Sequence, residues 1–203
     1  LARFHAHNWM NRDRRDANPI VWGIGRTPKV LQASYRRNRE AFVDRFGSLI
    51  GEGMVARMDE VQERLPEFAS QMEQSPWTLC HGDYRLDNLM FRPNGETVVL
   101  DWQGLGWGRA GWEVAYFITT ALEPHHRDEE QMLLRRYHQV LIGEGVQDYS
   151  YEDLVDDVTT AKAVLAHRMV AGDDLLDTGM EDGEPDLVDV IVQRVVGWVD
   201  FEE

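Results

Sequence analysis

Three short apolar runs separated by turn residues interrupt a chain whose periodicity is otherwise helical. The run 77–81 is bounded by a proline and a glycine, which is typical of a short buried strand. The runs 88–91 and 97–100 are joined by a segment containing Asn94-Gly95, a pair that strongly favours a tight β-hairpin turn. We therefore expect the chain to fold around one small hairpin set between helices.

Helical periodicity occupies both flanks of the hairpin region. Upstream, Pro28 suits the first turn of one helix, and Pro66 is expected to bend the next. Residues 12–26 contain two clusters of helix breakers and are expected to form a loop. We expect helices from Leu1 and over residues 29–46, 52–74, 111–122, 128–143, 151–171 and 185–200. The predicted fold class is α+β, mainly helical, with residues 1–203 forming one structural unit.

The charge balance of the chain is strongly acidic. Of 203 residues, 21 are Lys or Arg and 36 are Asp or Glu, which gives a formal net charge of −15. This balance argues against nucleic acid and membranes as partners, because anionic phosphates bind basic patches. A cationic small-molecule ligand is compatible with this negative charge. The acidic run within residues 173–189 is either a solvated loop or an acidic lip for such a ligand.

Cys80 is the single cysteine, so it cannot form an internal disulfide, and its apolar neighbours indicate a small core residue. A reducing compartment follows, and we expect a cytoplasmic protein. No apolar run approaches the roughly 20 residues of a membrane-spanning helix. The first residues, from Leu1 onward, carry no signal-peptide pattern.

Acidic and amide side chains gather around the predicted hairpin. Asp83 and Asn88 lie five positions apart across a loop, and Asp101 follows the second hairpin strand. Because the hairpin folds Asn88 and Asp101 toward each other, two oxygen ligands suited to Mg²⁺ would meet beside the free carboxylate of Asp83. Phosphoryl transfer needs metal ligands and a separate base for a hydroxyl proton. The alternative is that these residues are ordinary turn formers, but the full spacing favours the catalytic interpretation.

These residues resemble the signature of the aminoglycoside phosphotransferase and choline kinase-like enzymes, relatives of the protein kinases. The resemblance rests on His-Gly-Asp at 81–83 with four residues before Asn88, and on Leu-Asp-Trp-Gln at 100–103. It extends forward to residues 113–117 and backward to residues 1–6, which resemble the first helix of the large kinase lobe. The resemblance implies a protein-kinase-like large lobe with a small catalytic β-hairpin.

The resemblance also implies roles for individual residues. Asp83 would be the general base, His81 would have a structural role in the loop, and Asn88 and Asp101 would bind Mg²⁺. Arg85 would either stabilise the transferring phosphoryl group or form a salt bridge to a nearby carboxylate.

Other residues near the motif carry weaker expectations. Glu113 stands where the family usually has Asp, in a position that braces the catalytic loop. Trp102 is expected to be a packing residue, while Trp107 and Trp112 belong either to the core or to a pocket rim. The pairs His125-His126 and His5 with His7 are expected to be exposed loop or helix-face histidines rather than metal ligands, because they lack partners at zinc-like spacing.

Together these implications predict an ATP-dependent phosphotransferase that moves the γ-phosphoryl group to a hydroxyl of a small, possibly cationic molecule, using Mg²⁺. Such kinases hold ATP with a small lobe that contains a glycine-rich cover and a strand lysine. Neither lysine of this chain, Lys29 or Lys162, lies in an expected strand. We therefore expect residues 1–203 to be the large lobe alone, with the small N-terminal lobe absent from this chain.

A large lobe by itself is expected to be inactive. It is also expected to self-associate through the apolar surface that the missing lobe would cover. The alternative to a kinase lobe is a non-catalytic, pseudokinase-like binding module that keeps the loop for its fold.

Overall fold

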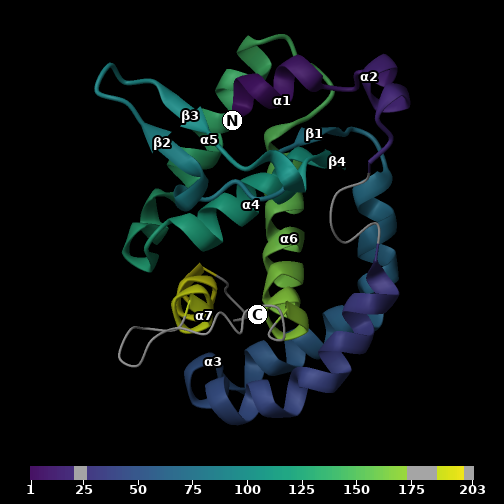
Figure 1. Ribbon diagram of the computed structural model, residues 1–203, viewed down its shortest axis with the longest axis vertical. Helices are drawn as coiled ribbons and strands as arrows, with labels where there is room; N and C mark the ends of the chain where they lie inside the picture. The colour runs from purple at the N-terminus through teal and green to yellow at the C-terminus, as the bar shows by residue number, and fades with distance from the viewer. Residues whose placement is uncertain (21–26, 173–186, 199–203) are drawn as a thin grey trace.

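A long helix, α6, forms the centre of the molecule, and α3 and α4 pack against it (Figure 1). The computed structural model describes residues 1–20, 27–172 and 187–198. Over these residues the α-helices are α1 (Ala2–Asn8), α2 (Arg12–Ala17), α3 (Pro28–Glu73), α4 (Ala110–Ala121), α5 (Glu130–Gly143), α6 (Tyr151–Gly172) and α7 (Leu187–Trp198). The strands are β1 (Thr78–Cys80), β2 (Leu89–Phe91), β3 (Thr97–Val99) and β4 (Gly106–Gly108). The architecture is α+β and mainly helical, as the sequence predicts.

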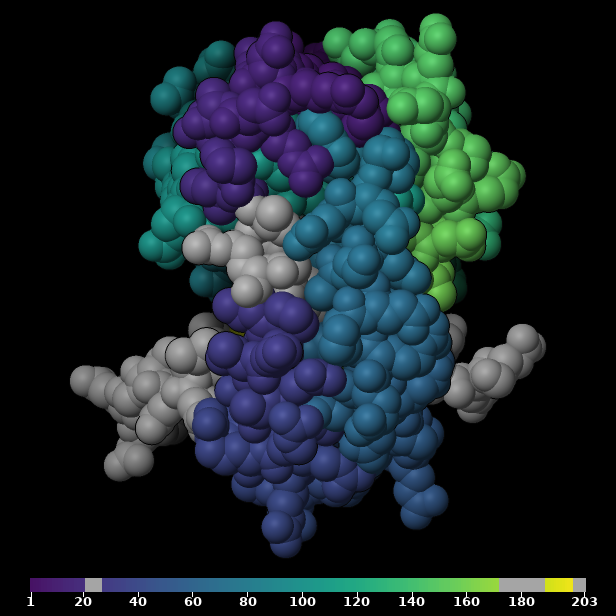
Figure 2. All heavy atoms as spheres, turned by 90° about the vertical axis from the view of Figure 1, so that its right-hand side faces the viewer, coloured from purple at the N-terminus to yellow at the C-terminus, as the bar shows by residue number. Residues whose placement is uncertain are grey.

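α3 folds back on itself as two antiparallel halves. Gly51 interrupts the helix with φ of 72° and ψ of 165°, a conformation that glycine adopts because it has no Cβ. Gln32 and Gln62 each donate a side-chain hydrogen bond to the other's carbonyl oxygen, at 2.6 and 3.1 Å. Tyr35 donates to Asp59 at 2.8 Å. The two halves therefore lie side by side along one face of the molecule, as Figure 2 shows.

The helices expected over residues 29–46 and 52–74 are confirmed as the two halves of α3. Pro66, where a bend is expected, instead keeps helical backbone angles, and the interruption lies at Gly51. Proline has no N–H for the carbonyl four residues before it, which here is that of Gln62. That carbonyl accepts from the side chain of Gln32, so the unpaired group is satisfied across the helical hairpin.

The strands form two small antiparallel pairs. β1 pairs with β4, with Leu79 opposite Trp107, and β2 pairs with β3, with Met90 opposite Val98. The strand expected over 77–81 and the β2–β3 hairpin are thus confirmed. β4 is not predicted from sequence, because its Gly-Trp-Gly sequence lacks the apolar run of a strand. The hairpin projects from the helical body (Figure 1).

The N-terminal region differs from the expectation in one place. Residues 12–26 are expected to form a loop, but residues 12–17 form α2. The side chain of Asn11 caps this helix by accepting the N–H of Arg14 at 3.1 Å. α2 buries none of its residues, so it lacks the apolar stripe that identifies a helix in sequence. Residues 21–26 lie outside the described part of the chain.

The burial of several side chains can be compared with the sequence-based expectations. Trp107 and Trp112 are 2% and 3% exposed, so both belong to the core and neither forms a pocket rim. Cys80 is fully buried, as expected. Most of the acidic run lies outside the described residues, at 173–186. Within the described ranges, no helix is both long and apolar enough to cross a membrane.

Candidate active site

The loop of residues 81–88, here named the Asp83 loop, connects β1 to β2 and brings Asp83 against Asn88. Asn88 Nδ2 donates to the carbonyl oxygen and to Oδ2 of Asp83, both at 2.8 Å. Oδ1 of Asp83 accepts the hydroxyl of Tyr116 at 2.6 Å. Both carboxylate oxygens are therefore oriented, while 28% of the Asp83 side chain stays exposed. A fixed, accessible carboxylate of this kind can accept a proton from a bound hydroxyl.

His81 joins the Asp83 loop to the end of the hairpin. Its Nδ1 accepts the N–H of Asp83 at 3.2 Å, so Nε2 carries the ring proton and donates to the carbonyl oxygen of Leu100 at 2.8 Å. The ring of Trp102 packs edge-on against it, with centroids 4.7 Å apart. This buried position is the kind expected for a histidine with a structural role. Trp102 is a packing residue here, although 43% of it is exposed.

At the open end of the hairpin the backbone of Asn88 lies next to Leu100, the residue before Asp101. The N–H of Leu100 donates to the carbonyl oxygen of Asn88 at 2.8 Å, and Asp101 is the next residue. Asp101 has φ of 55° and ψ of 70°, a left-handed conformation that is uncommon outside glycine but tolerated by aspartate. Its exposed carboxylate accepts from Gln103 at 3.3 Å.

These two residues offer oxygen donors that suit a hard cation. Because Asn88 Nδ2 makes both of its hydrogen bonds to Asp83, its amide oxygen is turned away from that carboxylate. The amide oxygen and the carboxylate of Asp101 are the ligand types that Mg²⁺ prefers. The chemistry of this donor set fits a magnesium site.

Glu113, on α4, holds the backbone of the Asp83 loop from behind. Its Oε2 accepts the N–H of His81 at 2.9 Å, and its Oε1 accepts the N–H of Gly82 at 2.6 Å. The side chain is completely buried. The extra methylene relative to Asp is thus accommodated, because the longer carboxylate still reaches both N–H groups. Gly104 presses on the same loop, since a Cβ there would lie 3.1 Å from the carbonyl oxygen of His81.

Arg85 forms ion pairs with two carboxylates of the Asp83 loop. Its Nε lies 3.3 Å from Asp83 Oδ1, and one terminal nitrogen lies 3.1 Å from Asp87 Oδ2. The salt bridge considered as one of its two roles is therefore present. The contact also keeps a guanidinium group directly beside Asp83.

Tyr116 and Arg168 are site residues that the sequence analysis does not identify. Burial, and then the hydrogen bond to Asp83, raises the pKa of Tyr116, so its hydroxyl stays a donor. Burial lowers the pKa of Arg168, while Tyr116 and then Asp83 oppose that change. α4 supplies the tyrosine and α6 supplies the arginine. The signal available in sequence was weak, since both residues stand on otherwise apolar helix faces.

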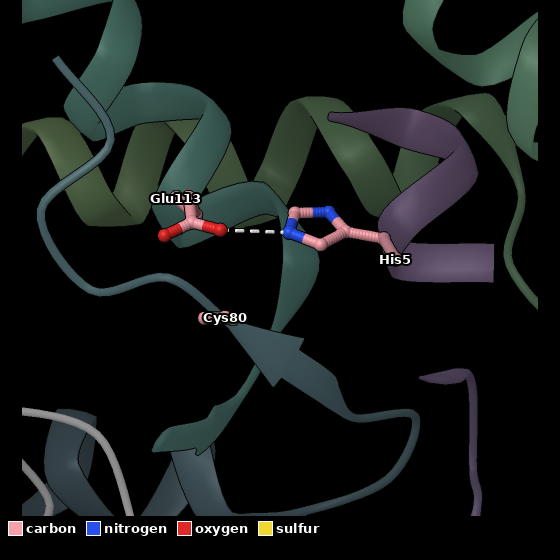
Figure 3. Close-up of side chains that lie close together, drawn as sticks. All are labelled: His5, Cys80 and Glu113. Atoms are coloured by element: carbon pink, nitrogen blue, oxygen red, sulfur yellow. Dashed lines mark hydrogen bonds and ion pairs between the residues drawn. The ribbon is translucent and has the colours of Figure 1, made fainter. Parts of the chain in front are cut away.

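A second group of titratable side chains lies behind the loop. One ligand atom each from His5, Cys80 and Glu113 lie within 4.8 Å of one another, and all three side chains are buried (Figure 3). His5 Nε2 donates to Glu113 Oε2 at 2.8 Å. Burial raises the pKa of the Cys80 thiol well above its usual value. The expectation that His5 is exposed is wrong: the side chain is completely buried, and its two ring nitrogens bind Tyr137 and Glu113. Cys80 and Glu113 are each singled out in the sequence, but not as neighbours of His5.

Comparison with known protein families supports the kinase-like interpretation of the chain. The ecdysteroid kinase-like family matches residues 1–147, which include α1, the Asp83 loop, the hairpin and α4. No curated protein and no solved structure matches the chain. The match is to a relative of the choline kinases rather than to the aminoglycoside phosphotransferases themselves. The matched residues make up more than half of the chain, so this protein belongs to the ecdysteroid kinase-like family of small-molecule phosphotransferases.

Proposed function

We propose that this chain supplies the catalytic lobe of an enzyme that transfers the γ-phosphoryl group of ATP to a hydroxyl of a small molecule. The observation that carries the proposal is the combination of fixed orientation and partial exposure of the Asp83 carboxylate. Its carboxylate is oriented by Asn88 and Tyr116 at 2.8 and 2.6 Å, remains partly exposed, and belongs to a loop braced by Glu113. A carboxylate that served only to stabilise the fold would not need to be both held in one orientation and exposed to solvent.

Asp83 would accept the proton of the acceptor hydroxyl as that oxygen attacks the γ-phosphorus in line. The hydroxyl proton moves to the carboxylate of Asp83, and the hydroxyl oxygen forms a bond to the γ-phosphorus. The bond between the γ-phosphorus and the bridging oxygen of ADP breaks. Arg85, beside the same carboxylate, would face the negative charge of the phosphoryl group during transfer.

Asn88 and Asp101 would hold the magnesium ion. When bound, Mg²⁺ neutralises negative charge on the ATP phosphates. Asn88 would serve twice, because its amide hydrogens orient Asp83 while its amide oxygen is available to the metal. The net charge of −15 favours a neutral or cationic acceptor alcohol over an anionic one.

The experiment compares Asp83→Asn with wild type in the natural protein that contains this chain. ADP release is followed in a coupled assay with Mg²⁺, ATP and a panel of neutral and cationic alcohols. We expect turnover to fall by roughly 10² to 10⁴, because the proton acceptor is lost. The control is Glu96→Gln, which removes an exposed carboxylate from the hairpin turn and should leave turnover unchanged. Wild-type turnover in Asp83→Asn would refute the proposal and favour a non-catalytic binding module.

A further inference from the structure

A continuous series of hydrogen bonds leads from α5 through α1 and α4 to the Asp83 loop. The hydroxyl of Tyr137 lies 2.6 Å from Nδ1 of His5. His5 Nε2 lies 2.8 Å from Oε2 of Glu113, and that oxygen also accepts the N–H of His81 at 2.9 Å. Figure 3 shows the ring of His5 and the carboxylate of Glu113 pointing toward each other. Side chains from α5, α1 and α4 are thus linked in series to the carboxylate that braces the loop.

The direction of each hydrogen bond follows from its partners. A carboxylate can only accept, so His5 carries its proton on Nε2 and donates to Glu113. In the neutral ring Nδ1 is then an acceptor, and Tyr137 is its donor. Burial raises the pKa of Tyr137 well above its usual value, so its hydroxyl keeps the proton that this bond needs. Every polar atom of the His5 ring is therefore occupied, and the ring orientation is fixed.

His5 also contacts the strand that leads into the loop. Its carbonyl oxygen accepts the hydroxyl of Thr78, on β1, at 2.7 Å. The residue therefore binds the start of the loop segment through its backbone and the loop brace through its ring. Since His5 is completely buried, no water competes for these bonds.

We infer that His5 is a positioning residue for the Asp83 loop, acting through Glu113, with Tyr137 fixing its ring. The inference rests on the proposed function for its catalytic consequence. Without the ring N–H, Glu113 would lose one of three donors and could turn within its buried site. The N–H groups of His81 and Gly82 would then be held less firmly, and Asp83 follows them directly in the chain.

A metal ion shared by His5, Cys80 and Glu113 is the competing explanation of this cluster. Two features speak against it. The oxygens of Glu113 already accept three N–H groups. Burial also keeps the Cys80 thiol protonated, whereas a metal requires the thiolate. Metal binding is therefore an outcome that the experiment must separate.

The experiment uses the natural protein with two substitutions at the same position. His5→Gln places an amide N–H near the position of Nε2 and so retains a donor to Glu113, whereas His5→Leu removes it. The readout is amide hydrogen exchange of His81 and Gly82, followed by NMR at neutral pH. We expect His5→Leu to accelerate exchange at these two amides about tenfold or more beyond the change in the core of α6. His5→Gln should remain within a few-fold of wild type.

His167→Leu is the matched control. It removes another completely buried histidine, whose Nε2 lies 2.8 Å from Gln62 Oε1 on α3 rather than from Glu113. It should lower the melting temperature without selectively accelerating the His81 and Gly82 amides. Tyr137→Phe, which deletes only one hydroxyl, gives a second variant should His5→Leu not fold. It should produce a smaller acceleration at the same two amides.

Unchanged exchange in both His5→Leu and Tyr137→Phe, or equal acceleration in His167→Leu, would overturn the inference. So would stoichiometric zinc in the purified wild-type protein, because these side chains would then be metal ligands. In the activity assay, His5→Leu should lower kcat by about tenfold and leave the KM for ATP within twofold of wild type. The exchange result does not depend on turnover, so an inactive protein or a fully active Asp83→Asn variant would count against the proposed function alone.

Discussion

Asn88 makes both of its amide hydrogen bonds to Asp83, one to the carbonyl oxygen and one to the carboxylate, each at 2.8 Å. The pair is thus a single unit in which the metal-ligand candidate also orients the base candidate. Removing the amide nitrogen must disturb both functions at once.

Asn88→Asp tests this coupling. The substitution replaces the donor with a second carboxylate against Asp83, and the two negative charges repel. We expect turnover in the natural protein to fall by about 10² or more, even though a carboxylate is a good Mg²⁺ ligand. Asn94→Asp, in the exposed hairpin turn, is the matched control and should have turnover close to wild type. Full activity of Asn88→Asp at high Mg²⁺ would show that orientation of Asp83 by Asn88 is dispensable.

Gly104→Ala should displace the Asp83 loop. The new Cβ would lie 3.1 Å from both the carbonyl oxygen of His81 and the carbonyl carbon of Gly82. Because both are backbone atoms, relief requires movement of the loop, and we expect a loss of about 1 to 3 kcal/mol of stability. Denaturant unfolding measures this change. Gly53→Ala, in α3 with no atom within 4 Å of its Cβ, should be neutral or slightly stabilising, and equal losses in both variants would contradict the prediction.

His167 should make the protein less stable in mild acid. Burial, and then the charge of Arg168, lowers the pKa of His167 from 6.5 to about 4. Its Nδ1 has no hydrogen-bond partner within the described residues. Between about pH 6.5 and pH 4 the unfolded chain therefore binds a proton that the folded chain does not.

Stability from this group is complete above pH 6.5 and is lost as pH falls through that window. The two pKa values give an upper limit of about 3 kcal/mol. The measurement is urea unfolding at pH 7 and pH 4.5 for wild type and His167→Gln. The substitution should reduce the difference between the two pH values. An unchanged difference would mean that His167 is protonated in the folded state or that other groups dominate.

The 203-residue chain by itself should bind Mg²⁺ and ATP weakly or undetectably in calorimetry. Lys29 lies in the first turn of α3, and Lys162, on α6, is paired with Glu130 at 2.5 and 2.7 Å, so neither lysine lies in a strand. With only Mg²⁺ and Arg85 to hold them, the ATP phosphates would be poorly oriented. A positive control is the natural protein under the same conditions. Tight binding by the chain as a monomer would show that its ATP site is complete.

The local parts of the site could be predicted because they depend on short stretches of sequence. The Asn-Gly turn sets the hairpin, and the hairpin brings Asn88 next to the residue before Asp101. The partner of β1 could not be predicted in this way. β4 has only one apolar side chain between two glycines, and its pairing depends on a chain reversal of more than twenty residues.

The residues that orient and brace Asp83 were harder to predict for the same reason. Tyr116 lies 33 positions from Asp83, and His5 lies 108 positions from Glu113. A polar residue in an otherwise apolar helix gives no indication of which distant group it will meet. The two helices on either side of Gly51 could be predicted from their own periodicity, but only the structure shows that they run antiparallel.

Glu113 and Tyr116 stand three residues apart on α4, and between them they bind three consecutive residues of the Asp83 loop. Three residues correspond to about 4.5 Å of rise along one face of a helix. The fixed spacing of these two side chains on α4 therefore sets the positions of residues 81–83 relative to the helix. Inserting or deleting one residue between these positions would rotate one contact by about 100° and break both sets of hydrogen bonds, so we expect this spacing to tolerate no change in length.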